Sequence, residues 1–331
     1  PPHTHTTSVR AAAATVPLLR WALSSGCPRT ARLAAEAALH GRLRVVQAAH
    51  ESGCPWAASA CGAAAEGGHL AILEYARRNG CLWDATTCAR AARGGHLLVL
   101  EWARDNGCPW DEHTCRHAAA GGHLELLRWA RENGCPWNAW TCSAAAEGGH
   151  LAVLQWARAA GCPWDVHAVL GAARGGHVAV LRWVHDAGCP GVWWWAVCTT
   201  AAAAGRLGAL RLARALGCPW DAYTCAAAAR GGHLAVLRWA RAGGCACDAS
   251  TCSAAAEGGH LALLRWARAN ACPWDRHTAL SAAKGGHLEV LRWAVENECP
   301  WDAEACCAAA RCAEVRAWVV ARGAPESAAW H

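Results

Sequence analysis

A loop motif close to Gly-Cys-Pro-Trp-Asp returns at a fixed interval along almost the whole chain. Its cysteine recurs every 27 residues, with a single interval of 29 residues, at Cys27, Cys54, Cys81, Cys108, Cys135, Cys162, Cys189, Cys218, Cys245, Cys272 and Cys299. A second motif, Gly-Gly-His, keeps a constant offset, at His69, His96, His123, His150, His177, His233, His260 and His287. Such a period is typical of a solenoid, in which each repeat packs only on its neighbours. The chain is therefore predicted to be an array rather than a set of globular domains.

The repeat from Cys108 to Gly134 predicts a helix, a turn, a second helix and a loop. Asp111 or Thr114 is positioned to cap the first helix, and an Ala-rich stretch of high helix propensity follows. Gly121 is expected to be the left-handed residue that ends this helix. The second helix carries apolar residues along one arc and charged residues along the other. Helices of about nine or ten residues are marginal alone, so stacking must bury their apolar faces.

The predicted fold is all-α: a curved, elongated solenoid of stacked helix-turn-helix repeats. The array is expected to occupy residues 9–325 as about twelve helix pairs, including partial end repeats, with an irregular repeat at 189–217. Residues 1–8 are expected to be a loose lead-in and 326–331 a C-terminal tail. The first residue is proline rather than methionine, which predicts missing N-terminal sequence and leaves room for a targeting segment. The compartment stays open, with the cytoplasm or another reducing compartment favoured.

Composition narrows the class of protein. Hydrophobic residues make up 54% and charged residues 17%, which is too apolar for a disordered chain. No uncharged apolar run reaches the length of about 18 residues that a membrane span needs. The net charge of +6 would assist an acidic partner but falls short of the dense basic footprint of a nucleic-acid module.

These motifs resemble the ankyrin repeat family, in a short 27-residue variant with Gly-Cys-Pro-Trp-Asp loops. The resemblance covers nearly the whole chain and rests on Thr87-Cys88, Ala91-Ala92, Gly95-His96-Leu97 and Val99-Leu100. The usual ankyrin unit has about 33 residues, so about six are absent here, and their loss is expected to remove the projecting hairpin fingers. The resemblance implies a protein-interaction scaffold without intrinsic catalysis.

The recurring cysteines, histidines and tryptophans are interpreted as packing residues. Where the helix cysteine is replaced, Val169 or Ala279 stands in its place, and these can substitute for a small buried hydrophobe but not for a metal ligand. The histidines are expected to order the turn between helices, and the tryptophans to pack between repeats. We therefore expect no metal and no cofactor. A structural zinc or redox thiol protein is the less favoured alternative, carried by the additional cysteines Cys247, Cys306, Cys307 and Cys312.

Partner binding is expected where the repeat is not uniform, because packing dictates the uniform positions. Five residues after the loop cysteine, the chain carries aromatic and imidazole side chains that suit a binding surface, namely His113, Trp140, His167, Tyr223 and His277. An exposed variable row without a partner is the competing interpretation. The irregular repeat adds Trp193, Trp194 and Trp195, which either repack internally or expose aromatic surface.

The outer stripe of the second helices changes sign along the array. It begins with Glu74 and Glu101 and continues with Arg128, Arg182, Arg211, Arg238, Arg265 and Arg292. This stripe could steer an acidic protein or a nucleic-acid backbone, and a solvated face is the plainer interpretation. Adjacent opposite charges such as Glu66 and Arg93 also predict ladders between repeats.

The favoured function is a non-enzymatic protein–protein interaction scaffold or a stably bound subunit of a larger assembly. Its expected partners are other proteins, and nothing indicates a homo-oligomer. A basic solenoid that associates with nucleic acid or another polyanion is the first alternative.

Overall fold

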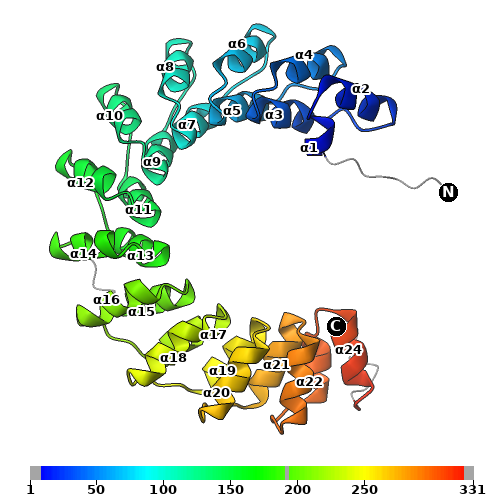
Figure 1. The fold of residues 1–331 in the computed structure, drawn as a ribbon, viewed down its shortest axis with the longest axis vertical. Coiled ribbons are helices and arrows are strands. Elements are labelled where there is room, and N and C mark those ends of the chain that lie inside the picture. Colours follow the sequence, from blue (N-terminus) through cyan, green and yellow to red (C-terminus); the bar gives the residue numbers. More distant parts are fainter. Residues whose placement is uncertain (1–8, 191–193, 324–331) are drawn as a thin grey trace. The chain divides into compact units, whose positions relative to one another are not determined.

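The computed structural model of the chain describes residues 9–190 and 194–323, with all side chains in these ranges except those of Trp194 and Trp195. These ranges contain 24 helices and no strand, so the predicted all-α helical repeat is confirmed (Figure 1). The helices group into two compact units, Pro1–Ala168 (the N-terminal unit) and Val169–His331 (the C-terminal unit). The extent of the array predicted from the sequence, residues 9–325, stays a prediction.

The helices of the N-terminal unit are α1 (Val9–Ala12), α2 (Val16–Ser24), α3 (Ala31–Leu39), α4 (Leu43–Glu51), α5 (Ala58–Glu66), α6 (Leu70–Arg78), α7 (Ala85–Gly94), α8 (Leu97–Asp105), α9 (Glu112–Gly121), α10 (Leu124–Glu132), α11 (Ala139–Gly148) and α12 (Leu151–Ala159). Helix α13 (Val166–Gly175) contains the boundary between the two units, which falls between Ala168 and Val169. The C-terminal unit continues with α14 (Val178–Asp186), α15 (Trp194–Ala203), α16 (Leu207–Ala215), α17 (Ala222–Arg230), α18 (Leu234–Ala242), α19 (Ala249–Glu257), α20 (Leu261–Ala269), α21 (Arg276–Gly285), α22 (Leu288–Glu296), α23 (Ala303–Ala309) and α24 (Ala313–Val320).

The two helices of each repeat pack differently. First helices, such as α5, α7 and α9, lie side by side and make the most extensive contacts within each unit. Second helices, such as α6, α8 and α10, pack mainly on the first helix of their own pair and splay apart from one another (Figure 1). Small side chains explain the close approach, because paired alanines such as Ala91 and Ala92 are fully buried between first helices.

A repeated apolar core holds each pair together. One leucine of the second helix is completely buried in nearly every repeat, as at Leu73, Leu100, Leu127, Leu154, Leu181, Leu210, Leu237, Leu264 and Leu291. Burial of one such side chain contributes about 1.5–3 kcal/mol. The loop cysteines from Cys54 to Cys299 are also buried, and thiols such as those of Cys108 and Cys135 donate weak hydrogen bonds to the N-cap carbonyl of a first helix. Their expected packing role is confirmed.

Most first helices begin at an aspartate or asparagine. Asp111 is the N-cap of α9, and its side chain accepts a hydrogen bond from the backbone N–H of His113. Asp84, Asn138, Asp221, Asp248 and Asp275 do the same in α7, α11, α17, α19 and α21. Thr114, the other candidate cap, lies inside α9 and is fully buried.

The Gly-Gly-His turn corrects one expectation. Gly121 is still helical, and the left-handed residue that ends α9 is the next one, Gly122, with φ +76°. A Cβ atom on Gly121 would lie 2.4 Å from Nε2 of His123, and one on Gly122 would lie 2.5 Å from Nδ1 of His150. Both glycines are therefore required for the approach of a histidine ring, and only the second is also required by its backbone conformation.

The histidine of this turn connects neighbouring repeats. Nε2 of His123 lies 3.1 Å from the carbonyl oxygen of Arg93, which belongs to the last turn of α7 in the preceding repeat. The same contact, at 2.9–3.2 Å, is made by His69, His96, His150, His233, His260 and His287. A carbonyl only accepts, so Nε2 carries the proton and satisfies a carbonyl that the helix end leaves unpaired. In the irregular repeat, Nε of Arg206 donates the equivalent hydrogen bond to the backbone carbonyl oxygen of Arg174. The expected turn-ordering role is confirmed.

The tryptophans join repeats on the other side of the helix pairs. The loop residue Trp110 meets Trp129 of α10 edge to face at 5.9 Å between ring centroids, and the guanidinium of Arg104 in α8 lies 4.2 Å from the centre of the Trp110 ring. Similar pairs form at Trp83, Trp137, Trp220 and Trp274. The expected packing between repeats is confirmed, with an arginine as an additional member of each contact.

Replacing Gly95 by alanine should destabilise the protein more than the same change at Gly107. Both residues have a left-handed backbone, with φ +77° and +80°, which costs about 1–2 kcal/mol for any other residue. Only at Gly95 would the new Cβ also meet the His123 ring, at 2.5 Å, so a further loss of about 1–3 kcal/mol is expected. Urea unfolding followed by circular dichroism measures both. Equal losses would contradict the proposed histidine contact.

Candidate functional site

The variable row of the sequence occupies one structural position. Each member is the second residue of a first helix, and its backbone N–H donates to the N-cap side chain, as for Trp140 with Asn138 at 3.0 Å. The side chain is exposed at all five predicted site residues of this row, which are His113, Trp140, His167, Tyr223 and His277. The backbone capping is therefore independent of the side chain, which leaves this position free to vary. We call these five residues the first-helix row.

Trp140 stands out within the first-helix row of the N-terminal unit. Its side chain is 48% exposed, and its ring stacks on that of His167 with centroids 4.8 Å apart and planes inclined by 28°. On its other neighbour, α9, the guanidinium of Arg116 lies 5.5 Å from the Trp140 ring centre. These three side chains, from three consecutive first helices, form what we call the Trp140 platform. They hold a large aromatic surface in a fixed orientation at the surface.

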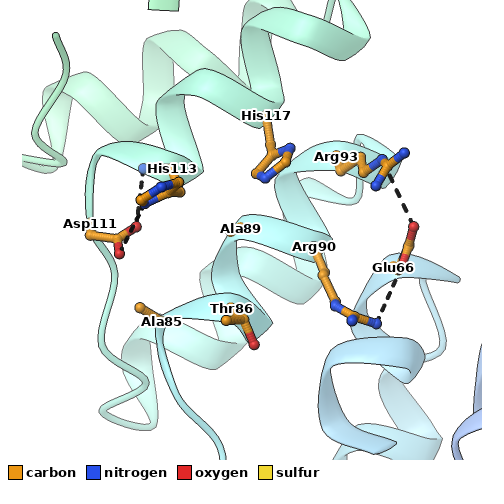
Figure 2. Close-up of a pocket in the computed structure, with 9 residues that line it drawn as sticks. All are labelled: Glu66, Ala85, Thr86, Ala89, Arg90, Arg93, Asp111, His113 and His117. Atoms are coloured by element: carbon orange, nitrogen blue, oxygen red, sulfur yellow. Dashed lines mark hydrogen bonds and ion pairs between the residues drawn. The ribbon is translucent and has the colours of Figure 1, made fainter. Parts of the chain in front are cut away.

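A hollow of about 430 Å³ lies on the same face, over α5, α7 and α9 (Figure 2). Its lining residues are Glu66, Ala85, Thr86, Ala89, Arg90, Arg93, Asp111, His113 and His117. Glu66 anchors one side, with carboxylate oxygens 3.5 Å from Nη1 of Arg90 and 3.9 Å from Nε of Arg93. The predicted ladder between Glu66 and Arg93 is thus present, and Arg90 completes it. The hollow combines apolar walls with groups that donate and accept hydrogen bonds.

Two histidines face this hollow in different states of exposure. His113 is exposed, and its Nδ1 lies 3.3 Å from a carboxylate oxygen of Asp111. His117 is half-buried, and burial lowers its pKa below the ordinary value of 6.5. The positive charges of Arg93 and Arg116 lower the pKa of His117 further. His117 is therefore mostly uncharged at neutral pH, and the guanidinium groups of Arg90 and Arg93 supply positive charge at the hollow.

The remaining predicted site residues belong to the C-terminal unit. Tyr223 is 72% exposed at the start of α17, and His277 lies two first helices further, at the start of α21 beside a smaller hollow. Helix α19 lies between them, so the structure does not bring these two together. Trp193 lies outside the described residues, as do the side chains of Trp194 and Trp195. The prediction for these three tryptophans stays a prediction.

The basic stripe of the second helices contacts aromatic rings. The guanidinium of Arg128 lies 5.8 Å from the ring centre of Trp156 in the next second helix and 3.6 Å from the carboxylate of Glu125. Arg211, Arg238, Arg265 and Arg292 make the corresponding ring contacts. At the position that would serve Arg182 the usual tryptophan is replaced by Leu212, which is buried. Sequence reasoning missed these ring contacts, because the partners lie about one repeat apart in the chain.

Cys247 occupies the place of a loop tryptophan and is only half-buried. The neighbouring thiols of Cys225 and Cys272 lower the pKa of the Cys247 thiol, with further help from the charge of Arg241. Burial raises the pKa of the Cys252 thiol to about 12. Cys247 therefore has the thiolate character and access that reactivity requires.

Within residues 9–190 and 194–323, no group of three or more histidine, cysteine, aspartate or glutamate side chains is arranged to hold a metal ion. Over the same ranges, none of the helices combines the length and the apolar character that crossing a membrane requires.

Comparison with known proteins gives structural matches alone. No protein-family model matches the chain, and no curated protein does so either. Among solved structures, 152 chains match. One is the crystal structure of the human ASB11 ankyrin repeat domain, with 19% sequence identity and a TM-score of 0.38, covering 47% of this chain and 83% of that one. The helical-repeat architecture is shown by the chain's own helices and their contacts.

An NMR titration of His117 should give a midpoint below 6.5, because burial and two nearby arginines disfavour its charged form. Since this pKa is lower in the folded chain than in the unfolded chain, its contribution to stability is present above about pH 6.5 and is lost as the pH falls towards the folded midpoint. Replacing Arg93 by glutamine should raise the midpoint. A wild-type midpoint at or above 6.5 would contradict the assigned environment.

Alkylation of the folded protein by iodoacetamide at neutral pH should modify Cys247 at least about tenfold faster than Cys252, because the first is accessible and ionises more readily. Peptide mass spectrometry over a time course measures both rates in one sample. Similar rates would show that the thiol contacts of Cys247 do not activate it.

Proposed function

We propose that this chain is a non-catalytic scaffold for other proteins, or a stably bound subunit of a larger assembly, and that a partner docks on the Trp140 platform. One observation carries the proposal: Trp140 presents about half of a large aromatic side chain to solvent while Arg116 and His167 fix its orientation. Aromatic and arginine side chains held in this way are typical of the residues that dominate binding energy in protein interfaces. Pre-orientation also lowers the entropy lost on binding.

The hollow beside the platform supports the same proposal. It offers concave space of about 430 Å³ lined by apolar, cationic and acidic groups, which suits one or two side chains of a docked polypeptide. The resemblance to short ankyrin repeats, stated above from Thr87-Cys88 and Gly95-His96-Leu97, points to the same class of function.

The non-catalytic part of the proposal rests on how the potentially reactive residues are used. The recurrent histidines donate Nε2–H to backbone carbonyls of the preceding repeat, as His96 does to the carbonyl of Glu66. The recurrent thiols are buried against helix N-caps, as Cys108 is against Asp84. Both sets serve packing, and neither faces the hollow.

The change Trp140→Ser should weaken partner binding by at least about tenfold, as expected when a central interface aromatic is lost. The partner is first identified by affinity purification of the intact protein and mass spectrometry, and its affinity is then measured with purified components. Leu98→Ser is the matched control, because Leu98 is an exposed apolar residue of the same unit, 74% exposed on the second helix α8.

Unchanged affinity in Trp140→Ser would overturn the assignment of the docking site. An equal loss in Leu98→Ser would show that the effect is not specific to the Trp140 platform. Circular dichroism of both variants should match that of the wild-type chain, because both side chains are exposed.

A further inference from the structure

Four arginines of the C-terminal unit form a row on its second helices. The guanidinium carbons of Arg211, Arg238, Arg265 and Arg292 lie 5.7–6.0 Å from the ring centres of Trp239, Trp266, Trp293 and Trp318, respectively. Each arginine belongs to one second helix and its tryptophan to the next, from α16 through α24. We call these four residues the arginine row. Its members recur once per repeat and are held by the same kind of contact.

The charges of the arginine row are not neutralised by this chain. All four side chains are exposed, and within the described residues none has a carboxylate within 4 Å. Helices α16, α18 and α20 contain no acidic residue at all. Glu289 of α22 precedes Arg292 by one turn but forms no ion pair with it, whereas Glu125 pairs with Arg128 at 3.6 Å in the N-terminal unit. The second helices of the C-terminal unit thus carry a continuous row of unpaired arginines, whereas α6 and α8 of the N-terminal unit have Glu74 and Glu101 at the equivalent position.

The tryptophan contacts prepare these arginines to bind an anion. A guanidinium that rests on an aromatic ring keeps N–H groups in its plane that can donate two parallel hydrogen bonds to a carboxylate or a phosphate. The ring contact also restricts a long, flexible side chain before binding, which reduces the entropy lost when the ligand arrives.

We propose that the arginine row is a docking surface for an acidic polypeptide segment. The arginine row shares no residue with the Trp140 platform, and the inference rests on the proposed function only in taking another protein as the partner. The first helices pack at about the 8–10 Å that is usual for helices in contact, and the second helices that carry the arginine row splay apart, so its arginines recur about every 10 Å or slightly more. Carboxylates on every third residue of an extended chain are about 10 Å apart, since each residue advances about 3.3 Å. Such a segment can present one carboxylate to each arginine.

A nucleic-acid backbone fits this surface less well. One strand of a duplex carries a phosphate about every 3.4 Å, so one arginine per repeat would meet only about every third phosphate. The tryptophan rings already carry arginines on one face, so they offer little stacking surface to unpaired bases. The sequence pI of about 8.5 also lies below the value of about 9 that is typical of nucleic-acid modules.

The test uses the full chain and four fluorescein-labelled probes followed by anisotropy. They are a peptide with glutamate at every third position, a peptide of the same composition with its glutamates consecutive, a single-stranded DNA and a duplex DNA. The first peptide should bind most tightly, and its affinity should fall between about 50 and 200 mM salt because the contacts are ionic. Changing all four residues of the arginine row to glutamine should weaken this binding by at least about tenfold, since hydrogen bonds to charged groups are strong.

The matched control removes the same charge elsewhere. Glutamine at Arg10, Arg20, Arg32 and Arg44, which are exposed on α1 to α4 and form no ion pair among the described residues, should change the affinity by less than about twofold if long-range charge is a minor effect. Lysine at the four positions of the row should give an intermediate loss, because it keeps the charge without the planar pair of donors. Trp140→Ser should leave peptide binding unchanged, which separates this surface from the Trp140 platform.

The proposal is overturned if the wild-type chain binds neither peptide, or if either DNA binds more tightly than the spaced peptide. It is also overturned if both glutamine variants lose affinity equally, since binding would then follow net charge rather than the row. Matching circular dichroism spectra and thermal midpoints ensure that a loss in the row variant reflects the lost side chains and not unfolding.

Discussion

The bond from a histidine to the carbonyl end of the preceding first helix is the interaction on which the repeat depends. It satisfies a backbone acceptor that the helix end would otherwise leave unpaired, and it does so from a neighbouring repeat. The ring fits only because Gly121 and its equivalents carry no Cβ where the histidine approaches. Two glycines and one histidine must therefore recur in step, and this requirement explains the most regular part of the sequence.

Positions other than these glycines and this histidine can vary, and the structure shows two sets of variable positions on the surface. The cap hydrogen bond in the first-helix row is donated by a backbone N–H, so it does not depend on the side chain, and Trp140 can serve recognition. The arginine row uses a tryptophan that already packs on a loop tryptophan as a support, as Arg265 does with Trp293. In both cases a side chain of one repeat positions an exposed side chain of a neighbouring repeat. The proposed docking surfaces are thus consequences of the stacking.

Much of this fold follows from the sequence, because spacing and chemistry fix it locally. The helix pairs, the aspartate caps and the structural roles of the histidines and buried cysteines could all be predicted. The sequence predicts Gly121 as the left-handed glycine and the structure has Gly122 in that role, because the pattern does not show which of two adjacent glycines leaves the helix. The stacking of Trp140 on His167, the hollow near Glu66 and the tryptophan supports of the arginines were beyond prediction. They depend on the rotation of one repeat relative to the next, which residue spacing does not encode.

A double-mutant cycle between Gly95 and His123 tests the central claim most directly, because these residues belong to neighbouring repeats and meet only through the proposed contact. The free energies of unfolding of the wild-type chain, Gly95→Ala, His123→Ala and the double variant are measured by urea unfolding. The account predicts that removing the His123 ring relieves the clash, so that Gly95→Ala becomes less costly by about 1–3 kcal/mol in the His123→Ala background. Additive losses would show that the two positions do not interact, and would contradict the account of how the repeats are joined.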